Sequence, residues 1–508
     1  MHASAHSTTT MICDSELNGR QIHFVGIGGC GMNGLARMAQ HFGAVCSGSD
    51  PAGGPTITAL QQEGIMVTEE QTADTVPYHC DLLVYSAAIR HDQPELAEAR
   101  RRRIPVLKYA EMLGRLMVDR IGVAIAGTHG KSTTTSILSH ILLCANLDPS
   151  FIVGARCTQI GGGSHVGHSD ILVAEACEYE RSFHYLQPTH GLILNIEVDH
   201  LDFYSSMDEI VEAFATFAQK IPLHGQLLIH HEMPHRLSVT AGLGCKVETI
   251  GFNPQSDWRV QYESRDSVQN RPRACLRHNG DIVVSWDCPM PGKHMAYNAA
   301  AAAVIAHHLD VPWPVIRDAI ESFQGLDRRM QVIGTIGPHV NTGLATDSIN
   351  DRSNKVCLTK DAITIVDDYG HHPTEIAATL RALRQHYQPR RLICVFQPHQ
   401  HSRTRFLMEE FATSFGEADM VIVPEIYFVR DSDTERHAVT ATDLVRRLRE
   451  RGVRAWHLSP FEAIVEHLQV IGAPTDLIVT MGAGDVWKIA QQLLTSLDRT
   501  KSPTAIRS

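Results

Sequence analysis

Short apolar runs alternate with amphipathic segments along most of this chain, which is the pattern of strands and helices that follow one another. The first region has the order strand, glycine turn, helix, strand, which predicts a βαβ unit. Its predicted elements are strands at 22–25, 45–47, 81–86 and 105–107 and helices at 32–42 and 110–117. A boundary is predicted near Asp119, where the alternation starts again.

A second series of elements begins directly after that boundary. Its predicted elements are strands at 121–126, 170–173 and 191–196 and helices at 131–143 and 297–308. Between 227 and 285 the runs are short and alternate between apolar and polar residues, which predicts an antiparallel flank to the central sheet.

The stretch 336–360 is polar and poorly periodic, so it is predicted to be an inserted hairpin or a mobile loop, with a second boundary just before it. Alternation then resumes to the end of the chain. The predicted elements are strands at 362–366, 391–396, 420–423 and 477–481 and helices at 373–386 and 405–415.

Composition narrows the class of protein. The 508 residues are 43% hydrophobic and 20% charged, as in folded globular chains, and a net charge of -11 argues against nucleic-acid binding. Residues 1–20 lack the features of a signal peptide, and no apolar stretch is long enough to span a membrane, so a cytoplasmic protein without membrane contact is predicted. The twelve cysteines show no metal-binding spacing and are predicted to be reduced.

The first motif is a G-x-G-x-x-G run at 26–31 between a predicted strand and a predicted helix. Such glycines let the backbone approach a pyrophosphate at the helix N-terminus. Asp50 ends the next strand, where an acidic side chain normally accepts a ribose hydroxyl. By itself this motif favours a nicotinamide or flavin oxidoreductase, and a tight turn without a ligand is the plainer alternative.

The second motif is G-T-H-G-K-S-T at 127–133, again between a strand and a helix. It is interpreted as a phosphate loop, with Lys131 on the β and γ oxygens and the Ser132 hydroxyl on Mg²⁺. The usual spacing would place glycine at Ile125, so the loop is a shortened form. A chance turn is the alternative, but Lys-Ser-Thr-Thr-Thr starts a helix poorly unless an anion is bound there.

Polar residues also follow other strands of the second and third regions. Glu175 is a candidate metal ligand or a solvated loop residue, and Asn195, Asp199 and His200 follow the next strand. His200 by its chemistry alone is interpreted as a structural or acid-base residue, because Mg²⁺ prefers oxygen. Two dense polar clusters, 367–373 and 397–403, follow two strands of the last region and suit a site that closes over a substrate.

Together these motifs resemble the muramyl ligases, which build the stem peptide of peptidoglycan, and most closely the members that use a single amino acid. The resemblance spans nearly the whole chain, in runs that start at His23, Gly127, Asn195, Pro291, Gly325, Asp367 and Phe396. It implies an α/β fold of three domains: a Rossmann-like UDP-sugar domain at 1–118, a central P-loop ATPase-like domain on a mainly parallel sheet at 119–335, and a Rossmann-like closing domain at 336–508.

The resemblance also implies the reaction, which is ATP- and Mg²⁺-dependent joining of L-alanine to the carboxylate of UDP-N-acetylmuramate through an acyl phosphate. The implied catalytic residues are Lys131, Glu175, His200, Arg329 and Arg403. The implied metal ligands are Ser132, Glu175 and His200.

The remaining implied contacts fall into three sets. ATP is expected at Gly127, Thr128, His129, Gly130, Lys131, Ser132, Thr133, Asn195, His294, Asn298, Arg329 and Asp368. The UDP-sugar is expected at Gly26, Gly28, Gly29, Cys30, Gly31, Met32, Asp50 and Ser86, and the amino acid at Tyr369, His371, His399 and Arg403.

The chain departs from the family at three positions. Met295 replaces the usual Asn and Gln400 the usual Arg, whose loss removes a bidentate grip on a carboxylate, while Cys177 replaces the usual Asp. Two alternatives therefore stay open besides the oxidoreductase: a sister ligase that adds a preformed tripeptide, and a degenerate homologue that only binds UDP-sugars. The expected state is a monomer or a homodimer.

Overall fold

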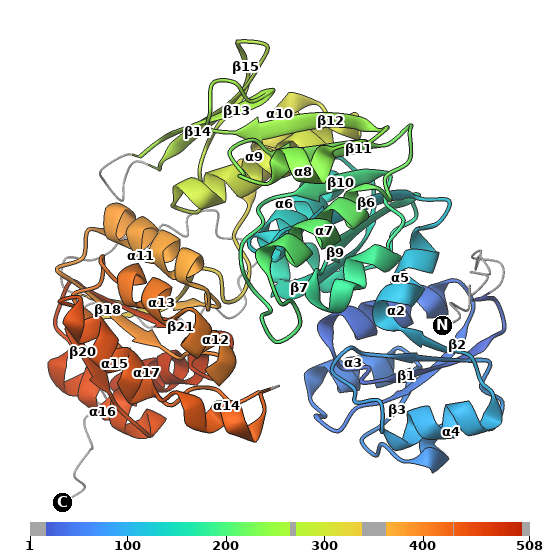
Figure 1. Ribbon diagram of the computed structural model, residues 1–508, viewed down its shortest axis with the longest axis horizontal. Coiled ribbons are helices and arrows are strands. Elements are labelled where there is room, and N and C mark those ends of the chain that lie inside the picture. Colours follow the sequence, from blue (N-terminus) through green and yellow to red (C-terminus); the bar gives the residue numbers. More distant parts are fainter. Residues whose placement is uncertain (1–16, 265–270, 338–361, 430, 500–508) are drawn as a thin grey trace, which may run out of the picture. The chain divides into compact units, whose positions relative to one another are not determined.

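Three β-sheets, each flanked by helices, follow one another along the chain in the computed structural model (Figure 1). The structure describes residues 17–264, 271–337, 362–429 and 431–499. The mixed α/β class with three domains and largely parallel sheets is as predicted. By its internal contacts the chain divides into two units. The first comprises Met1–Glu197, Met207–Arg259 and Ala299–Ala319, and the second comprises Val198–Ser206, Val260–Asn298 and Ile320–Ser508.

The first sheet has the strand order β3-β2-β1-β4-β5, and all of its pairs are parallel. Its strands are β1 (Gln21–Val25), β2 (Val45–Ser49), β3 (Met66–Thr68), β4 (Leu82–Tyr85) and β5 (Val106–Lys108). Its helices are α2 (Cys30–His41), α3 (Pro55–Gln62), α4 (Pro94–Arg102) and α5 (Tyr109–Met117). The chain order reverses between β1 and β4, and in open α/β sheets ligands bind beside such a point.

The second sheet has ten strands in the order β15-β14-β13-β12-β11-β10-β6-β9-β7-β8. They are β6 (Ile121–Ala126), β7 (Ser150–Cys157), β8 (Gly162–His165), β9 (Ile171–Ala176), β10 (His190–Ile193), β11 (Gln226–His230), β12 (Lys246–Gly251), β13 (Trp258–Glu263), β14 (Arg273–His278) and β15 (Asp281–Asp287). The associated helices are α6 (Lys131–Cys144), α7 (Met207–Ala218), α8 (Arg236–Thr240), α9 (Lys293–His308), α10 (Trp313–Ser322) and the 3₁₀ segment η3 (Tyr179–Tyr185).

The predicted antiparallel flank was wrong for most of its length. Strand β11 pairs parallel with β10, β12 with β11, and β13 with β12, and the antiparallel hairpin in this region is β14–β15. The reason is that alternation of polar and apolar residues reports one exposed face, whereas strand direction depends on how each connection crosses the sheet.

The third sheet has the order β16-β17-β21-β18-β19-β20, in which β16 is antiparallel to β17. Its strands are β16 (Gln331–Ile336), β17 (Ile363–Asp368), β18 (Arg391–Phe396), β19 (Met420–Val423), β20 (Ala455–His457) and β21 (Asp476–Met481). Its helices are α11 (Pro373–Tyr387), α12 (His401–Phe406), α13 (Met408–Ser414), α14 (Asp433–Ala438), α15 (Ala441–Glu450), α16 (Phe461–Ile471) and α17 (Trp487–Arg499). The helix predicted at 405–415 is thus two helices, which meet at Leu407.

Neighbouring residues of the strands in the third sheet face two different hydrophobic clusters. Val366 packs in a cluster with residues of α11, α13 and α15, while Ile365 packs in one with residues of α16 and α17. Helices therefore cover both faces, and the near-continuous apolar runs of the strands are what burial on both sides requires.

Two sequence predictions on organisation remain predictions. Most of the stretch 336–360 lies outside the described residues. The domain boundaries at 118 and 335 stay a proposal. Strand Gln331–Ile336, which spans the second of these boundaries, pairs in the third sheet. Among the described residues, no helix is long and apolar enough to cross a membrane.

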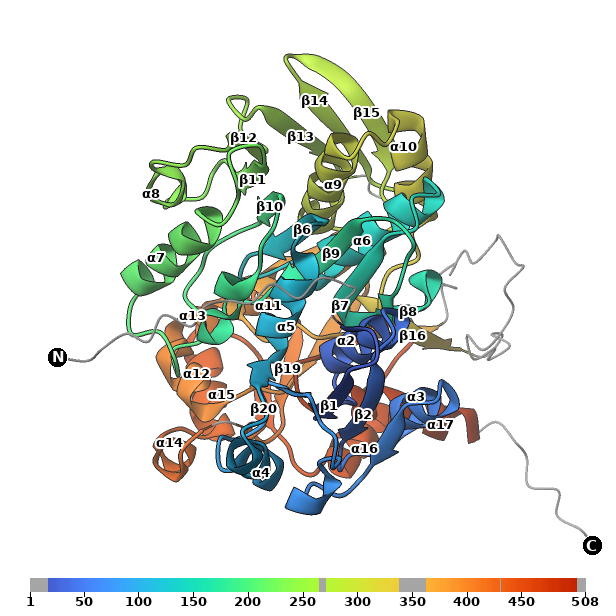
Figure 2. The ribbon, with the colours of Figure 1, turned by 90° about the vertical axis from the view of Figure 1, so that its right-hand side faces the viewer.

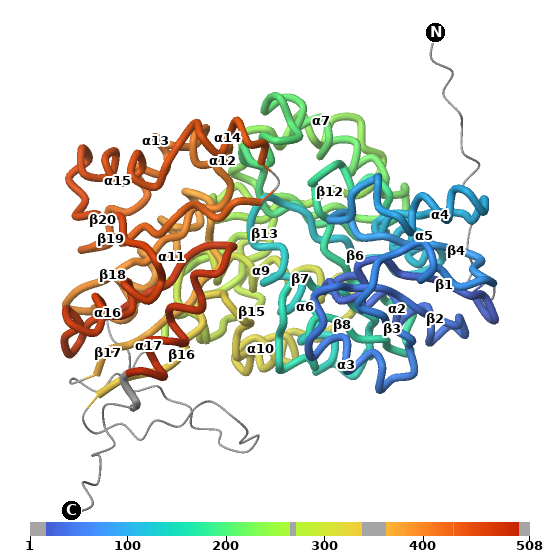
Figure 3. Tube along the Cα trace, turned by 90° about the horizontal axis from the view of Figure 1, so that it is seen from below, coloured from blue at the N-terminus to red at the C-terminus, as the bar shows by residue number. Residues whose placement is uncertain are grey.

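Within the first unit, α2 packs against the edge of the central sheet. Figures 2 and 3 both show α2 beside β7 and β8. The approach is close enough that a Cβ on Gly34 of α2 would lie 2.6 Å from the side chain of Ser164 in β8. Helix α5 is equally close to η3, because a Cβ on Gly114 would lie 2.0 Å from the carbonyl oxygen of Tyr185.

Replacing Gly114 tests the contact between α5 and η3. Alanine favours a helix over glycine by about 1 kcal/mol, but here its Cβ would meet backbone that has to move. We expect Gly114→Ala to lower the free energy of unfolding by about 1–3 kcal/mol, as overpacked sites do, measured by urea denaturation. Gly416→Ala is the control, because nothing lies within 4 Å of its Cβ position. Equal midpoints for the two variants would contradict the contact.

Candidate functional site

The glycine turn at 26–31 joins β1 to α2 in the first unit. Gly26 has a φ of +79°, and the backbone N–H groups of Gly26 and Ile27 both donate to the carbonyl oxygen of Ser49, at 2.8 and 3.1 Å. Gly28 N donates to Asp50 Oδ2 at 2.8 Å, so the predicted ribose ligand lies directly against the turn. The neighbouring strand end contributes Ser86, whose Cβ would be 3.3 Å from a Cβ on Gly26.

The predicted UDP-sugar residues are therefore gathered at the carboxyl ends of β1, β2 and β4. A side chain at either of two glycines of the turn would have to displace a neighbouring side chain, since a Cβ would lie 2.8 Å from Asp50 Oδ2 at Gly28 and 2.7 Å from the Tyr109 ring at Gly31. Met32, in contrast, is buried in α2. That the predicted UDP-sugar residues bind a sugar nucleotide stays a prediction.

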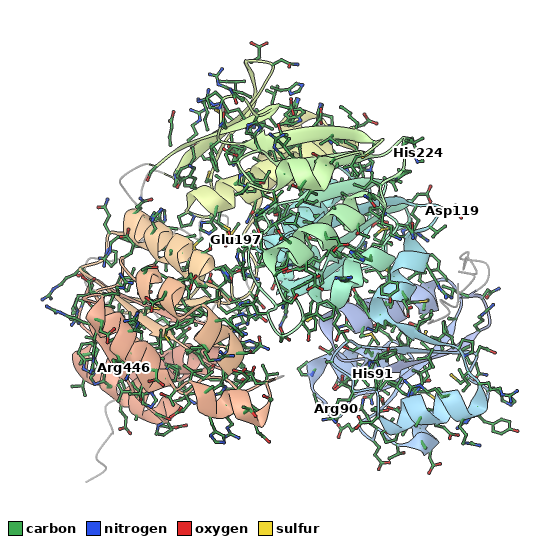
Figure 4. The ribbon with its side chains drawn as sticks, viewed as in Figure 1. Arg90, His91, Asp119, Glu197, His224 and Arg446 are labelled. Carbon is green, nitrogen blue, oxygen red and sulfur yellow. The ribbon has the colours of Figure 1, made fainter. Side chains whose placement is uncertain are left out.

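The phosphate loop, residues 127–133, leads from β6 into the fourteen-residue helix α6. Gly127 and Gly130 have φ angles of +140° and +86°, which L side chains rarely adopt. Asn195, after β10, accepts from His129 N at 2.7 Å and donates to His129 O at 3.0 Å. Thr128 is tied to the same segment, because Glu197 N (Glu197 is labelled in Figure 4) donates to Thr128 Oγ1 at 2.9 Å. Asn195 thus fixes the backbone of the loop.

Lys131 begins α6 and points back into the loop. Its Nζ lies 2.9 Å from Glu178 Oε2 and 3.1 Å from Glu178 Oε1, and it also donates to the carbonyl oxygens of Gly127 and Thr128. Burial alone would lower the pKa of Lys131, but the Glu178 carboxylate outweighs it and the pKa is raised. The ammonium is therefore charged and held at the place where phosphates are expected.

Ser132 and Glu175 are the two predicted metal ligands of the first unit, and they lie together. Ser132 Oγ donates to Glu175 Oε2 at 3.1 Å, and Gly154 N donates to the other carboxylate oxygen. A hydroxyl and a carboxylate side by side are oxygen donors of the type that Mg²⁺ prefers. These two residues fit a magnesium ion.

The glycine turn and the phosphate loop approach one another around Glu175. The pKa of the Cys30 thiol is raised, first by desolvation and then by the Glu175 carboxylate. Burial raises the pKa of Tyr109 too, with further contributions from Glu175, Cys177 and Cys30. Residues of the two motifs therefore lie within electrostatic reach of one carboxylate in the first unit.

In the second unit, Arg403 forms a buried ion pair with Asp199. Arg403 Nε and Nη2 donate to Asp199 Oδ1 at 3.0 and 2.8 Å, and both side chains are 7% exposed. Burial would raise the pKa of Asp199, but Arg403 and then His200 hold it well below its usual range. Arg403 Nη1 faces His399 Nδ1 at 3.1 Å, an arrangement in which this ring nitrogen accepts.

The aromatic and histidine residues predicted to bind the amino acid are neighbours of this pair. The His371 ring lies 5.4 Å from the Tyr369 ring and 5.9 Å from the His399 ring. Burial lowers the pKa of His371 to about 4, so this histidine is neutral near pH 7. Tyr369, His371, His399 and Arg403 form one cluster, and their binding of an amino acid stays a prediction.

Arg329 and His294 lie beside Glu375, near the start of α11. Arg329 Nη1 is 3.5 Å from Glu375 Oε1, and its guanidinium lies 5.1 Å from the centre of the Tyr369 ring. Burial lowers the pKa of His294 to about 4, while Glu375 and Arg329 act on it in opposite directions. Asn298, one turn after His294 in α9, is buried.

The Asp368 carboxylate, which was predicted to bind ATP, already accepts hydrogen bonds from within the protein. Its two carboxylate oxygens accept from the backbone N–H groups of Met330 and Gly370, both at 2.7 Å. Burial raises the pKa of Asp368 to about 6, against the effect of Arg329. Asp368 thus fastens the segment before β16 to the end of β17. His200, the third predicted metal ligand, belongs to the second unit, and its backbone N–H donates to Asp199 Oδ1 at 2.7 Å.

Two of the three departures from the family, Met295 and Gln400, have clear positions in the structure. Met295 is 5% exposed and packs in the hydrophobic cluster that includes Ile376 and Leu380 of α11, so an apolar side chain suits this site. Gln400 is buried with a φ of +70° at the start of α12, and it lines a small pocket with Asp199 and Arg403.

Three acidic residues important to the site received no role from the sequence. They are Glu178 beside Lys131, Asp199 beside Arg403, and Glu375 beside Arg329. Only Glu375 had a local signal, because His372 and Glu375 form a capping box at the start of α11. The other two pairings join distant parts of the chain.

Three family models match the chain in sequence order. They are the Mur ligase family catalytic domain at residues 21–120, the Mur ligase middle domain at 125–306, and the Mur ligase glutamate ligase domain at 352–484.

Individual relatives match over nearly the full length. A UDP-N-acetylmuramate--L-alanine ligase of Geobacter sp. (strain M21) is 36% identical over 95% of this chain and 98% of its own. The protein of the same name from Clostridium novyi (strain NT) is 38% identical over 94% and 98%. The crystal structure of a UDP-N-acetylmuramate-alanine ligase from Thermotoga maritima has the same fold, with a TM-score of 0.73, 24% identity, and coverage of 95% of this chain and 100% of that one. The chain belongs to the Mur ligase family.

Proposed function

We propose that this protein is a UDP-N-acetylmuramate:L-alanine ligase that forms one amide bond for each ATP it consumes. The observation that carries the proposal is the full-length similarity to relatives of that name, 36% and 38% identical, in a chain whose phosphate loop presents a charged Lys131. The cytoplasm, where ATP is available, remains the predicted location.

The chemistry follows from the resistance of a carboxylate to attack by an amine. The carboxylate of the sugar nucleotide first attacks the γ-phosphorus of ATP, which gives an acyl phosphate and releases ADP. The α-amine of the amino acid then attacks the acyl carbon, and inorganic phosphate leaves as the amide forms. The first step converts the carboxylate oxygen, a poor leaving group, into phosphate, a good one, which the second step expels.

In this proposal the first unit supplies the charge for phosphoryl transfer. The backbone N–H groups of the phosphate loop and Lys131 Nζ would neutralise the charge on the transferred phosphoryl group. Ser132 and Glu175 would hold Mg²⁺, which would supply positive charge against the transferring phosphoryl group, and His200 remains the predicted third ligand. The glycine turn would bind the diphosphate of the sugar nucleotide.

The second unit holds the residues expected to bind the amino acid. His371 and His399 lie beside Arg403, and both His371 and His294 are neutral near pH 7, so neither adds a positive charge. Arg403 already has an acidic partner in Asp199. A substrate carboxylate would therefore have to share or replace that partner.

Two other functions are tested by the same measurements. A sister ligase that adds a preformed tripeptide is disfavoured by the F-Q-P-H and S-R-T-R runs at 396–399 and 402–405. A degenerate homologue that only binds UDP-sugars was suggested by Met295 and Gln400, but Met295 has a packing role and Lys131 is in place.

The decisive measurement is phosphate release with ATP, Mg²⁺ and UDP-N-acetylmuramate as each amino acid is added in turn. We expect release with L-alanine, with serine and glycine as the closest competitors in size. Release only with a tripeptide would support the sister ligase. Lack of release with every amine, from protein that binds the sugar nucleotide, would support the degenerate homologue.

Replacing Lys131 separates the nucleotide site from the sugar site. We expect Lys131→Ala to lower kcat by about a thousandfold or more, as the loss of a phosphate-facing cation does, while the Kd for UDP-N-acetylmuramate stays unchanged. Calorimetry with each ligand measures this. Lys246→Ala, an exposed lysine on β12, is the control that should retain activity. Equal loss of sugar-nucleotide binding in the Lys131 variant would contradict the assignment of the two sites.

Alkylation of Cys30 probes the glycine turn directly. Because the pKa of this thiol is raised, its labelling by iodoacetamide should be slow near pH 7 and should quicken as the pH rises into and above the usual thiol range. Bound UDP-N-acetylmuramate should protect it. Mass spectrometry of the labelled peptide measures both effects, and unchanged labelling at saturating ligand would place the sugar nucleotide elsewhere.

A further inference from the structure

Glu178 is a buried acidic residue to which the reaction proposed above assigns no role. It follows β9 and directly precedes η3, and only 3% of its surface is exposed. Both of its carboxylate oxygens contact Lys131 Nζ, at 2.9 and 3.1 Å. The cation expected to bind phosphate is therefore already paired within the protein.

The other contacts of Lys131 complete its hydrogen bonding. Its Nζ also donates to the carbonyl oxygens of Gly127 and Thr128, which belong to the phosphate loop itself. An ammonium has three N–H donors, and these four oxygens are enough to occupy all of them. A phosphate oxygen can gain a hydrogen bond from Lys131 only if one of the present acceptors gives it up.

Glu178 is the acceptor whose exchange for phosphate is favoured by charge. The two carbonyls are fixed parts of the loop backbone, whereas Glu178 is a side chain that carries the same sign of charge as phosphate. With both present, two anionic groups would compete for one buried ammonium, and like charges at short range disfavour one another.

We propose that Glu178 is a positioning residue that competes with nucleotide phosphates for Lys131. Its carboxylate holds the ammonium in place in the nucleotide-free loop, is displaced by phosphate oxygens when ATP binds, and takes the ammonium back when ADP leaves. This inference rests on the proposed function, since it requires ATP in the phosphate loop.

Competition has a consequence that other roles of Glu178 do not share. Part of the binding free energy of ATP goes into breaking the Lys131–Glu178 pair, so the observed affinity is lower than the loop alone would give. Removing the charge of Glu178 should therefore tighten nucleotide binding. A residue that only supported the fold, or one that held a metal ion with the nucleotide, would leave binding unchanged or weaken it when replaced.

The test is the Kd of ATP with Mg²⁺ for Glu178→Gln, measured by calorimetry without the other substrates so that no turnover occurs. Gln has the same shape and keeps one acceptor oxygen but loses the charge. We expect the Kd to fall by about tenfold, the effect of losing one charge-assisted contact. In a chain that already carries Lys131→Ala, the same substitution should change the Kd by less than about twofold.

Glu180→Gln is the matched control. Glu180 lies two residues along the same segment and also pairs with a lysine, Lys108, at 3.0 Å, but it does not contact the phosphate loop. Its replacement removes the same charge and should leave the Kd of ATP unchanged. If both variants tightened binding equally, the cause would be net charge near the site, and the inference would be overturned.

The remaining outcomes are equally decisive. An unchanged or weaker Kd for folded Glu178→Gln refutes the competition. If that variant does not fold, Glu178→Asp keeps the charge with a shorter reach, and its Kd should fall by a smaller factor, whereas an unchanged or higher Kd overturns the inference. If the unaltered protein binds no ATP, the proposed function fails, which the wild-type titration shows separately.

Discussion

A buried positive charge needs a negative partner, and this constraint governs the candidate residues of each unit. Lys131 lies beside Glu178 in the first unit, and Arg403 lies beside Asp199 in the second. Desolvating an unpaired ammonium or guanidinium would cost far more than one interaction returns. The protein therefore keeps each of these two buried cations in place with an acidic residue of its own.

The same constraint links stability to activity. A cation whose hydrogen bonds are already formed in the free protein must change partners when a phosphate or a carboxylate binds. Breaking the existing contacts lowers the net binding free energy of the ligand. The acidic partners are thus not passive neighbours of the site. In the exchange proposed for Glu178, such a partner sets how strongly its cation is available to a phosphate.

Rigid backbone makes this arrangement possible. The phosphate loop is fixed by the two hydrogen bonds between Asn195 and His129, and the segment before β16 is fixed by the one that Met330 N donates to Asp368. In each case a polar side chain at a strand end satisfies backbone groups of another segment. These residues were predicted as nucleotide contacts, and the structure shows that they also hold the site in shape.

The sequence by itself determined the fold class, the order of the main strands along the chain and the two glycine-containing motifs. These follow from local pattern, because burial on both faces demands continuous apolar strands, and a strand, turn and helix in succession place glycines where phosphate is bound. Residues 127–133 could be interpreted without knowing their neighbours.

Tertiary structure alone decided the direction of the strands after β10 and the pairing of charges. Strand direction depends on how connections cross the sheet, and Glu178 and Asp199 meet their cations across 47 and 204 positions of the chain. Neither fact leaves a local pattern, because the sign and place of a buried partner are fixed only once the backbone has brought distant residues together.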